Sequence, residues 1–99
     1  MRRMRILGVD AEVAETFAER ARGLIGRDGL EEGRGLLIPR CGCIHTCFMR
    51  FPIDATFLDG RGVVVKTVRG IRPWRLFVWG GLRASQVLET AAAPLRLRP

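Results

Sequence analysis

Long apolar runs are missing from this sequence. None approaches the roughly 20 residues that a helix needs to cross a bilayer, so no membrane partner is expected. The basic start, Met1 to Arg5, is followed by a short apolar stretch at 6–9 and then by Asp10. A secretory signal has a longer apolar region than this, and the sequence therefore predicts a cytoplasmic protein.

Lysine is also scarce, and Lys66 is the only one. The 17 basic residues are otherwise arginines, and against 10 acidic residues they give a net charge of +7. Such a charge favours a polyanionic partner such as nucleic acid. It is equally typical of a coding bias toward arginine, with the guanidinium groups spread over solvated faces. We take this second interpretation as the default, because net charge alone predicts nonspecific attraction and no particular activity.

Cysteine and histidine are few, and all of them lie within residues 40–59. This central stretch holds the three cysteines and the single histidine of the chain. A cytosolic protein normally keeps its thiols reduced, and three thiols cannot all pair within one chain. Any chemistry carried by these residue types should therefore be sought in the central stretch.

The length and composition fit one globular domain over residues 1–99. The chain is 47% hydrophobic and 27% charged, with no internal repeat and no low-complexity segment. These proportions are typical of a folded protein and not of a disordered one. The order of predicted elements indicates an α+β fold, with a mostly antiparallel or mixed, partly barrel-like β-sheet and one N-terminal helix.

The N-terminal third predicts a strand at 3–9 and then a helix. Thr16 and Glu19 fit a capping box, which places the helix start at Thr16. Asp10 is a competing start, because apolar residues repeat at helical spacing from Val13 onward. The repeating residues are Val13, Phe17, Ala21 and Leu24. Either start places the last three of them against a core, and the glycines at 23 and 26 predict the helix end.

The remaining sequence predicts strands joined by short links. The predicted strands span 36–38, 53–58, 63–68 and 84–90. The glycine-containing turn at 59–62 joins two of them into a β-hairpin, since glycine accepts the positive φ that tight turns require. Residues 28–35 are predicted to be a loop. Residues 71–79 contain Pro73 and predict either an edge strand or a loop packed by its aromatic side chains.

One hypothesis for the central stretch is a metal or thiol site, because it contains three thiol groups and one imidazole group. They are Cys41, Cys43, His45 and Cys47, spaced two residues apart. Side chains two apart in a strand lie about 6.6–6.8 Å apart, whereas zinc holds its ligands at about 2.0–2.3 Å. A zinc site would thus need a sharp loop at Gly42. A nucleophilic cysteine with His45 as base would need a third group such as Asp54, and otherwise Cys43 and Cys47 are small buried residues. We assign no metal and no cofactor.

Polar residues near His45 and Asp54 form the leading candidate site. The candidate ligand contacts are His45, Thr46, Met49, Arg50 and Asp54. A polar cluster on otherwise apolar strands predicts a small non-enzymatic binding or accessory domain, whose partner is a small anionic or polar ligand or another protein. Alternatively, Asp54 points to solvent, or it anchors Arg50 or a turn amide.

Arginines interleaved with aromatic residues at 69–79 support a second hypothesis, a nucleic-acid-binding module. The candidate contacts are Arg69, Arg72, Trp74, Arg75 and Trp79. Stacking on aromatic faces combined with phosphate contacts is how single strands are bound. The structural alternative places the tryptophans in the core under extended arginines. A third hypothesis is an enzyme that depends on the cysteines and His45.

The central stretch resembles the signature of a prokaryotic family known as domain of unknown function 192. The matching residues read His45-Thr46-x-x-Met49-Arg50-Phe51-Pro52-Ile53-Asp54-x-x-Phe57-Leu58-Asp59. Further matches are Arg20-x-x-Gly23-Leu24, Gly35-Leu36-Leu37, Cys41 with Ile44, and Val87-Leu88-Glu89. The resemblance covers about residues 11–99 and implies a compact β-rich domain with a helix near its start. It implies no reaction.

Two features depart from the family pattern. Cys43 and Cys47 stand where the pattern does not require cysteine, so a thiol mechanism would not be a property of the family. The pattern also continues past Pro99 with a Gly-Asp turn and a final strand. Either that strand is dispensable or the sequence is truncated, and one sheet edge is expected to be affected.

Overall fold

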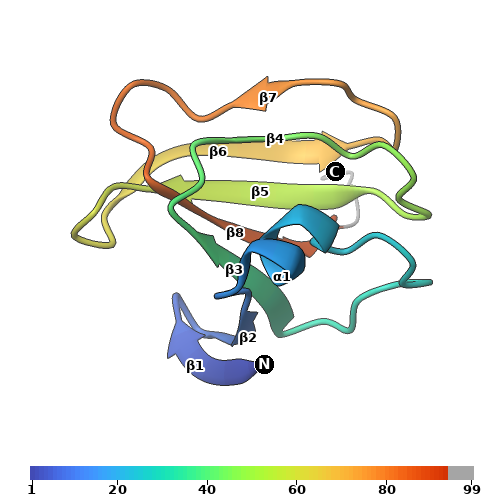
Figure 1. Cartoon of the computed structure of the whole chain (residues 1–99), viewed down its shortest axis with the longest axis horizontal. Coiled ribbons are helices and arrows are strands. Elements are labelled where there is room, and N and C mark those ends of the chain that lie inside the picture. The colour runs from blue at the N-terminus through green and yellow to red at the C-terminus, as the bar shows by residue number, and fades with distance from the viewer. Residues whose placement is uncertain (94–99) are drawn as a thin grey trace, which may run out of the picture.

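The computed structural model describes residues 1–93, and Figure 1 shows how their elements are arranged. The strands are β1 (Arg2–Ile6), β2 (Val9–Val13), β3 (Arg34–Pro39), β4 (Cys43–Ile44), β5 (Ile53–Leu58), β6 (Val64–Ile71), β7 (Val78–Trp79) and β8 (Gln86–Ala91). The single helix of the described residues, α1 (Phe17–Arg22), has six residues. The structure is therefore mostly β-sheet with one short helix near the N-terminus, as the sequence predicts. No helix among these residues is long and apolar enough to cross a membrane.

Six strands form one mixed sheet in the order β1-β2-β3-β8-β5-β6. Strands β2 and β3 pair in parallel, and the other neighbours pair antiparallel. The parallel pair requires a crossover, which runs through α1. Strands β1 and β6 are the open edges of the sheet within residues 1–93. The expected mixed sheet is confirmed, whereas its closure into a barrel is not.

Strands β4 and β7 form a separate two-stranded ribbon. Figure 1 shows this ribbon at one end of the molecule and the β1–β2 hairpin at the opposite end. Between them, the two faces of the six-stranded sheet bury different residues. Leu36 and Ile38 belong to the larger core cluster, which also contains Ile44 and Val78 of the ribbon. Leu37 belongs to the smaller cluster, as the alternation of side chains along a strand requires.

The predicted N-terminal strand at 3–9 is wrong in extent. A β-hairpin replaces it, because β1 and β2 pair antiparallel across a turn at Leu7 and Gly8. These two residues have φ values of 51° and 75°. Two-residue hairpin turns favour positive φ, but leucine adopts it rarely and therefore gives no turn signal in the sequence.

Thr16 caps α1 as predicted, whereas the competing start, Asp10, lies in β2. The backbone N–H of Glu19 donates to the Thr16 hydroxyl at 3.0 Å, and the Thr16 N–H donates to the Glu19 carboxylate at 3.0 Å. This reciprocal pair is the capping box that the sequence predicts. The hydrogen bond from the Thr16 backbone also helps to lower the pKa of Glu19.

Alanine at position 16 is expected to destabilise the protein by about 1 kcal/mol, because it removes the hydroxyl that accepts from the helix N-terminus. Differential scanning calorimetry should record a Tm lowered by about 4–8 °C for a domain of this size. Thr16→Ser keeps the hydroxyl and serves as the control. Equal losses in Thr16→Ala and Thr16→Ser would contradict the capping role.

The predicted core face of the helix is largely wrong. Phe17 is 80% exposed and Ala21 is exposed, whereas Leu24 is buried as expected. The helix ends at Arg22, and Gly23 follows with a φ of 54°. With only six residues, α1 does not present a continuous apolar stripe, and Leu24 reaches the core from the loop that follows.

The hairpin predicted over 53–68 is confirmed. Strand β5 has the predicted bounds, and β6 continues three residues further than predicted, so that Ile71 pairs with Ile53. In the turn, Asp59 accepts hydrogen bonds from the N–H groups of Val63 and Arg61 at 3.0 and 2.9 Å. These bonds, that from Val63 above all, lower the pKa of Asp59. The strand predicted at 84–90 corresponds to β8.

Candidate functional site

Asp54 lies in β5 with only 9% of its surface exposed, and it joins two neighbouring segments. Its Oδ1 accepts a hydrogen bond from the N–H of Gly70 at 2.8 Å, and its Oδ2 accepts one from Ala93 at 3.1 Å. Gly70 lies where the β5–β6 register shifts, because Ile53 pairs with Ile71 but Ala55 pairs with Val68. The carboxylate thus anchors backbone amides on both sides of β5, which was one of the roles considered from the sequence.

Arg50 contacts a different loop. Its Nη1 lies 2.6 Å from Oδ1 of Asp28, in the segment between α1 and β3. Both side chains are largely exposed, at 61% and 89%, so the pair contributes little to stability. It links the central stretch to the loop at 28–33.

Thr46 is fully buried and connects residues 45–49 to residues 72–75. Its hydroxyl donates to the carbonyl of Arg72 at 2.6 Å and accepts from the N–H of Arg75 at 2.9 Å. Its backbone N–H donates to the carbonyl of Arg75, and its carbonyl accepts from the N–H of Trp74, both at 2.9 Å. These four hydrogen bonds are termed the Thr46 clamp. Met49, 5% exposed, packs in the larger core cluster.

His45 is exposed, and its Nδ1 accepts a hydrogen bond from the N–H of Cys47 at 3.2 Å. Within residues 1–93, no hydrogen bond joins His45 to Asp54. The structure therefore links Arg50 and Asp54 to the segments on either side of them, and it leaves the imidazole at the surface.

The three cysteines are free thiols in different surroundings. Cys43 is exposed, which contradicts the interpretation that it is a small core residue, while Cys41 and Cys47 are half-buried. The Cys41 thiol donates to the carbonyl of Cys43 at 3.0 Å. Burial raises the pKa of the Cys41 thiol, and the nearby carboxyl group of Glu89 adds to that rise. In the described part of the chain, no three His, Cys, Asp or Glu side chains form a group that could hold a metal ion.

Glu89 and one nitrogen of the Arg20 side chain are buried. Glu89 of β8 is 3% exposed, and burial raises its pKa to about 7. The Nε of Arg20 is buried without a hydrogen-bond partner among residues 1–93. The burial of Glu89 could have been predicted from its position two residues after Val87, because the two side chains then point to the same face of a strand.

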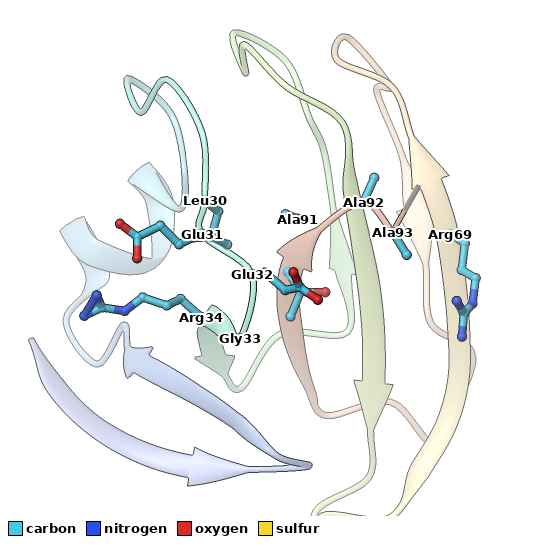
Figure 2. Close-up of a pocket in the computed structure, with 10 residues that line it drawn as sticks. Leu30, Glu31, Glu32, Gly33, Arg34, Arg69, Ala91, Ala92 and Ala93 are labelled. Carbon is cyan, nitrogen blue, oxygen red and sulfur yellow. The ribbon is translucent and has the colours of Figure 1, made fainter. Parts of the chain in front are cut away.

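A pocket of about 770 Å³ opens beside the end of β8. It is lined by residues 30–34, by Arg69 of β6 and by residues 90–93. Figure 2 shows Glu32 close to the end of β8 and Arg69 on β6, on the other side of β5, while Glu31 and Arg34 extend away from the three alanines. Asp54 helps to shape this pocket, since it binds the amides of Gly70, next to Arg69, and of Ala93.

A second feature is the aromatic surface, defined here by the exposed large apolar side chains of residues 48 and 74–82. Its members are Phe48, Trp74, Leu76, Phe77, Trp79 and Leu82, which are 65%, 60%, 82%, 61%, 47% and 94% exposed. The rings of Phe48 and Trp74 lie 4.7 Å apart and are tilted by 58°. The alternative that both tryptophans are core residues is therefore wrong. Arg72 and Arg75 are exposed on either side of Trp74, whereas Arg69 lines the pocket.

Comparison with models of known families matches residues 2–96 to DUF192, which is described as an uncharacterized ACR family. The chain belongs to the DUF192 family. The match begins nine residues before the region identified from the motifs and so includes the β1–β2 hairpin. No curated protein matches the sequence.

Two solved structures share the fold of this DUF192 protein. One is a protein of unknown function from Novosphingobium aromaticivorans, with a TM-score of 0.77 and 22% identity over 85% of this chain and 64% of that chain. The other is a proposed transcription regulator from Sinorhizobium meliloti, with a TM-score of 0.78 and 19% identity over 91% and 78%. The present chain thus spans less than two thirds of the Novosphingobium protein. At these identities, the likeness shows the fold alone.

Proposed function

We propose that this DUF192 protein is a small non-enzymatic binding domain, and that its ligand is a small polar molecule with an anionic group. The observation that carries the proposal is the pocket beside the end of β8. Two of the polar residues expected from the sequence, Arg50 and Asp54, contact the segments that form its walls. Their buried or paired positions give them a supporting role, and the lining residues make the contacts with the ligand.

The first wall is the loop that precedes β3. Leu30 packs against the larger core cluster, and Arg50 pairs with Asp28 two residues earlier. The apolar contact fixes the position of the loop, and the ion pair favours its orientation. Residues 31–33 are thereby held beside the end of β8.

The second wall and the floor depend on Asp54. The irregular register opposite Asp54 brings Arg69 and Gly70 between the paired residues of β6, and the carboxylate holds the Gly70 amide. Residues 91–93 are alanines, whose small side chains leave room above the floor. The Ala93 amide is held by the same carboxylate, so one buried side chain sets the spacing of wall and floor.

The charges of the lining indicate how a ligand would be oriented. Arg69 forms no ion pair within residues 1–93, so its guanidinium group is available to a carboxylate or phosphate. Glu32 lies near the end of β8 and offers an acceptor for a hydroxyl or amino group (Figure 2). A small molecule that carries an anionic group and a hydrogen-bond donor matches both.

Glutamine at position 69 is expected to weaken ligand binding about 10-fold or more, since a hydrogen bond to a charged group contributes about 1.5–3 kcal/mol. The test is an NMR titration of the ¹⁵N-labelled protein with a panel of amino acids, hydroxycarboxylates and phosphate esters. We expect shifts in the amides of Gly33, Gly70 and Ala93. Arg3→Gln, which removes an exposed charge from β1, is the matched control.

If no compound of the panel shifts the signals of these three amides, the pocket proposal is overturned. His45→Ala tests the wider site predicted from the sequence. A loss of binding in that variant would extend the site to residues 45–49, and unchanged binding would confine it to the pocket.

A further inference from the structure

The aromatic surface has no role in the small-ligand pocket. We propose that it binds single-stranded nucleic acid, with bases stacked on Phe48, Trp74 and Trp79 and phosphates held by neighbouring arginines. This activity goes beyond the pocket proposal and does not depend on it.

The first argument is exposure. Six large apolar side chains of residues 48 and 74–82 are nearly half exposed or more, and no described element covers them. Single exposed apolar residues are normal, but exposed aromatic rings that contact each other, as those of Phe48 and Trp74 do, are typical of interaction sites. Stacking needs accessible ring faces, and a tilted pair such as Phe48 and Trp74 presents two ring faces side by side.

The second argument is backbone conformation. Phe48 and Trp74 have φ values of 66° and 71°, in the left-handed region that disfavours residues with a side chain. Glycine would adopt this conformation without steric cost. Both aromatic residues remain more than half exposed, so burial in the core does not explain their presence. The Thr46 clamp holds Trp74 in this conformation, because Thr46 bonds to the backbone of residues 72, 74 and 75.

The third argument is charge. No acidic residue occurs between positions 60 and 88 or between positions 33 and 53. The basic residues of the first of these stretches are Arg61, Lys66, Arg69, Arg72, Arg75 and Arg83. Arg72, Arg75 and Arg83 are exposed and form no ion pair with a residue in the range 1–93. Exposed rings beside unpaired guanidinium groups match a polyanion that also carries flat apolar groups. A single strand offers both, whereas a duplex hides its base faces by stacking and pairing.

Both tryptophans of the protein lie on this surface, so their intrinsic fluorescence reports directly on stacking. The probe is a mixed-sequence single strand of about 12 nucleotides, a length within the known range for such sites. DNA and RNA versions are titrated in parallel. We expect either strand to quench the fluorescence, and the duplex of the same sequence to bind more weakly.

Three phosphate contacts predict a defined salt response. Each contact to a single strand contributes a slope of about −0.7 to the logarithmic plot of affinity against salt. With Arg72, Arg75 and Arg83 engaged, affinity should fall about 20-fold between about 50 and 200 mM salt. Arg75→Gln should reduce the magnitude of the slope by about 0.7, and Arg3→Gln on β1 should leave it unchanged.

Trp74→Gly separates binding from folding. Glycine suits the positive φ at this position, so Tm should be unchanged or higher than in the parent. Oligonucleotide affinity should nevertheless fall about 10-fold or more, since a base stacked on an aromatic ring contributes about 1–3 kcal/mol. Arg69→Gln should leave oligonucleotide binding intact, which distinguishes this surface from the pocket.

Several outcomes would overturn the proposal. They are affinity that does not change with salt, equal affinity in the parent and Trp74→Gly, and binding that is stronger for the duplex. A dimer seen by sedimentation in the parent and lost in Trp74→Gly, without oligonucleotide binding, would assign the surface to a second copy of the chain. Binding to anionic lipid vesicles but not to the oligonucleotide would assign it to a membrane.

Discussion

Glutamine in place of Glu89 is expected to raise the free energy of unfolding by about 3 kcal/mol at about pH 8, and to leave it nearly unchanged at about pH 4. The side chain is 3% exposed on β8, and burial raises its pKa from 4.5 to about 7. The folded protein therefore keeps the proton at pH values where the unfolded chain has released it. The contribution of Glu89 to stability is greatest below about pH 4.5 and is lost as the pH rises through about 7. The glutamine side chain does not titrate, so the variant does not lose this stability as the pH rises.

Urea unfolding of the parent and Glu89→Gln at a series of pH values measures the effect. The two curves of free energy against pH should coincide in acid and separate toward neutral pH. The Cys41 thiol lies near Glu89, and Cys41→Ala checks that this thiol does not cause the separation of the two curves. Parallel curves for the parent and Glu89→Gln across the whole range would contradict a raised pKa at this position.

Valine at position 46 should cost the protein about 2–4 kcal/mol of unfolding free energy. The methyl group replaces a hydroxyl that is buried and bonded both to the carbonyl of Arg72 and to the N–H of Arg75. Each of these backbone groups then loses a partner, at about 1–3 kcal/mol per unsatisfied group. Calorimetry should show a Tm lower by about 10–20 °C.

Thr46→Ser is the matched control for this variant. Serine keeps the hydroxyl and should recover most of the Tm, and the remaining difference should reflect the lost methyl group. The emission of Trp74 should change in Thr46→Val but not in Thr46→Ser, because only the former releases residues 72–75. A Thr46→Val variant as stable as the parent would show that the Thr46 clamp does not stabilise the fold.

Local patterns predicted the elements whose stabilising contacts are close in the sequence. The β5–β6 hairpin follows from alternating side chains and from the turn at 59–62, where Asp59 bonds to amides two and four residues away. The helix start follows from Thr16 and Glu19. The β1–β2 hairpin was missed because its turn uses Leu7, which adopts a positive φ only rarely.

The candidate site was harder to predict because its contacts are distant in the sequence. Asp54 stood out as a polar residue among apolar ones, but its bond to Ala93 spans 39 positions. The exposure of Trp74 and Trp79 depends on where the β4–β7 ribbon lies, and composition does not reveal this. The sequence indicated that Glu89 shares a strand face with Val87, but only the fold shows that this face is buried around Glu89.

Strand β8 lies at the centre of the sheet, yet its residues are among the last of those described. During synthesis, β3 and β5 leave the ribosome long before the strand that must pair between them. Until residue 91 has emerged, the edges of β3 and β5 that pair with β8 have no native partner. We therefore expect the sheet to complete its folding only after β8 has been synthesised, and the chain to be most prone to aggregate before that point.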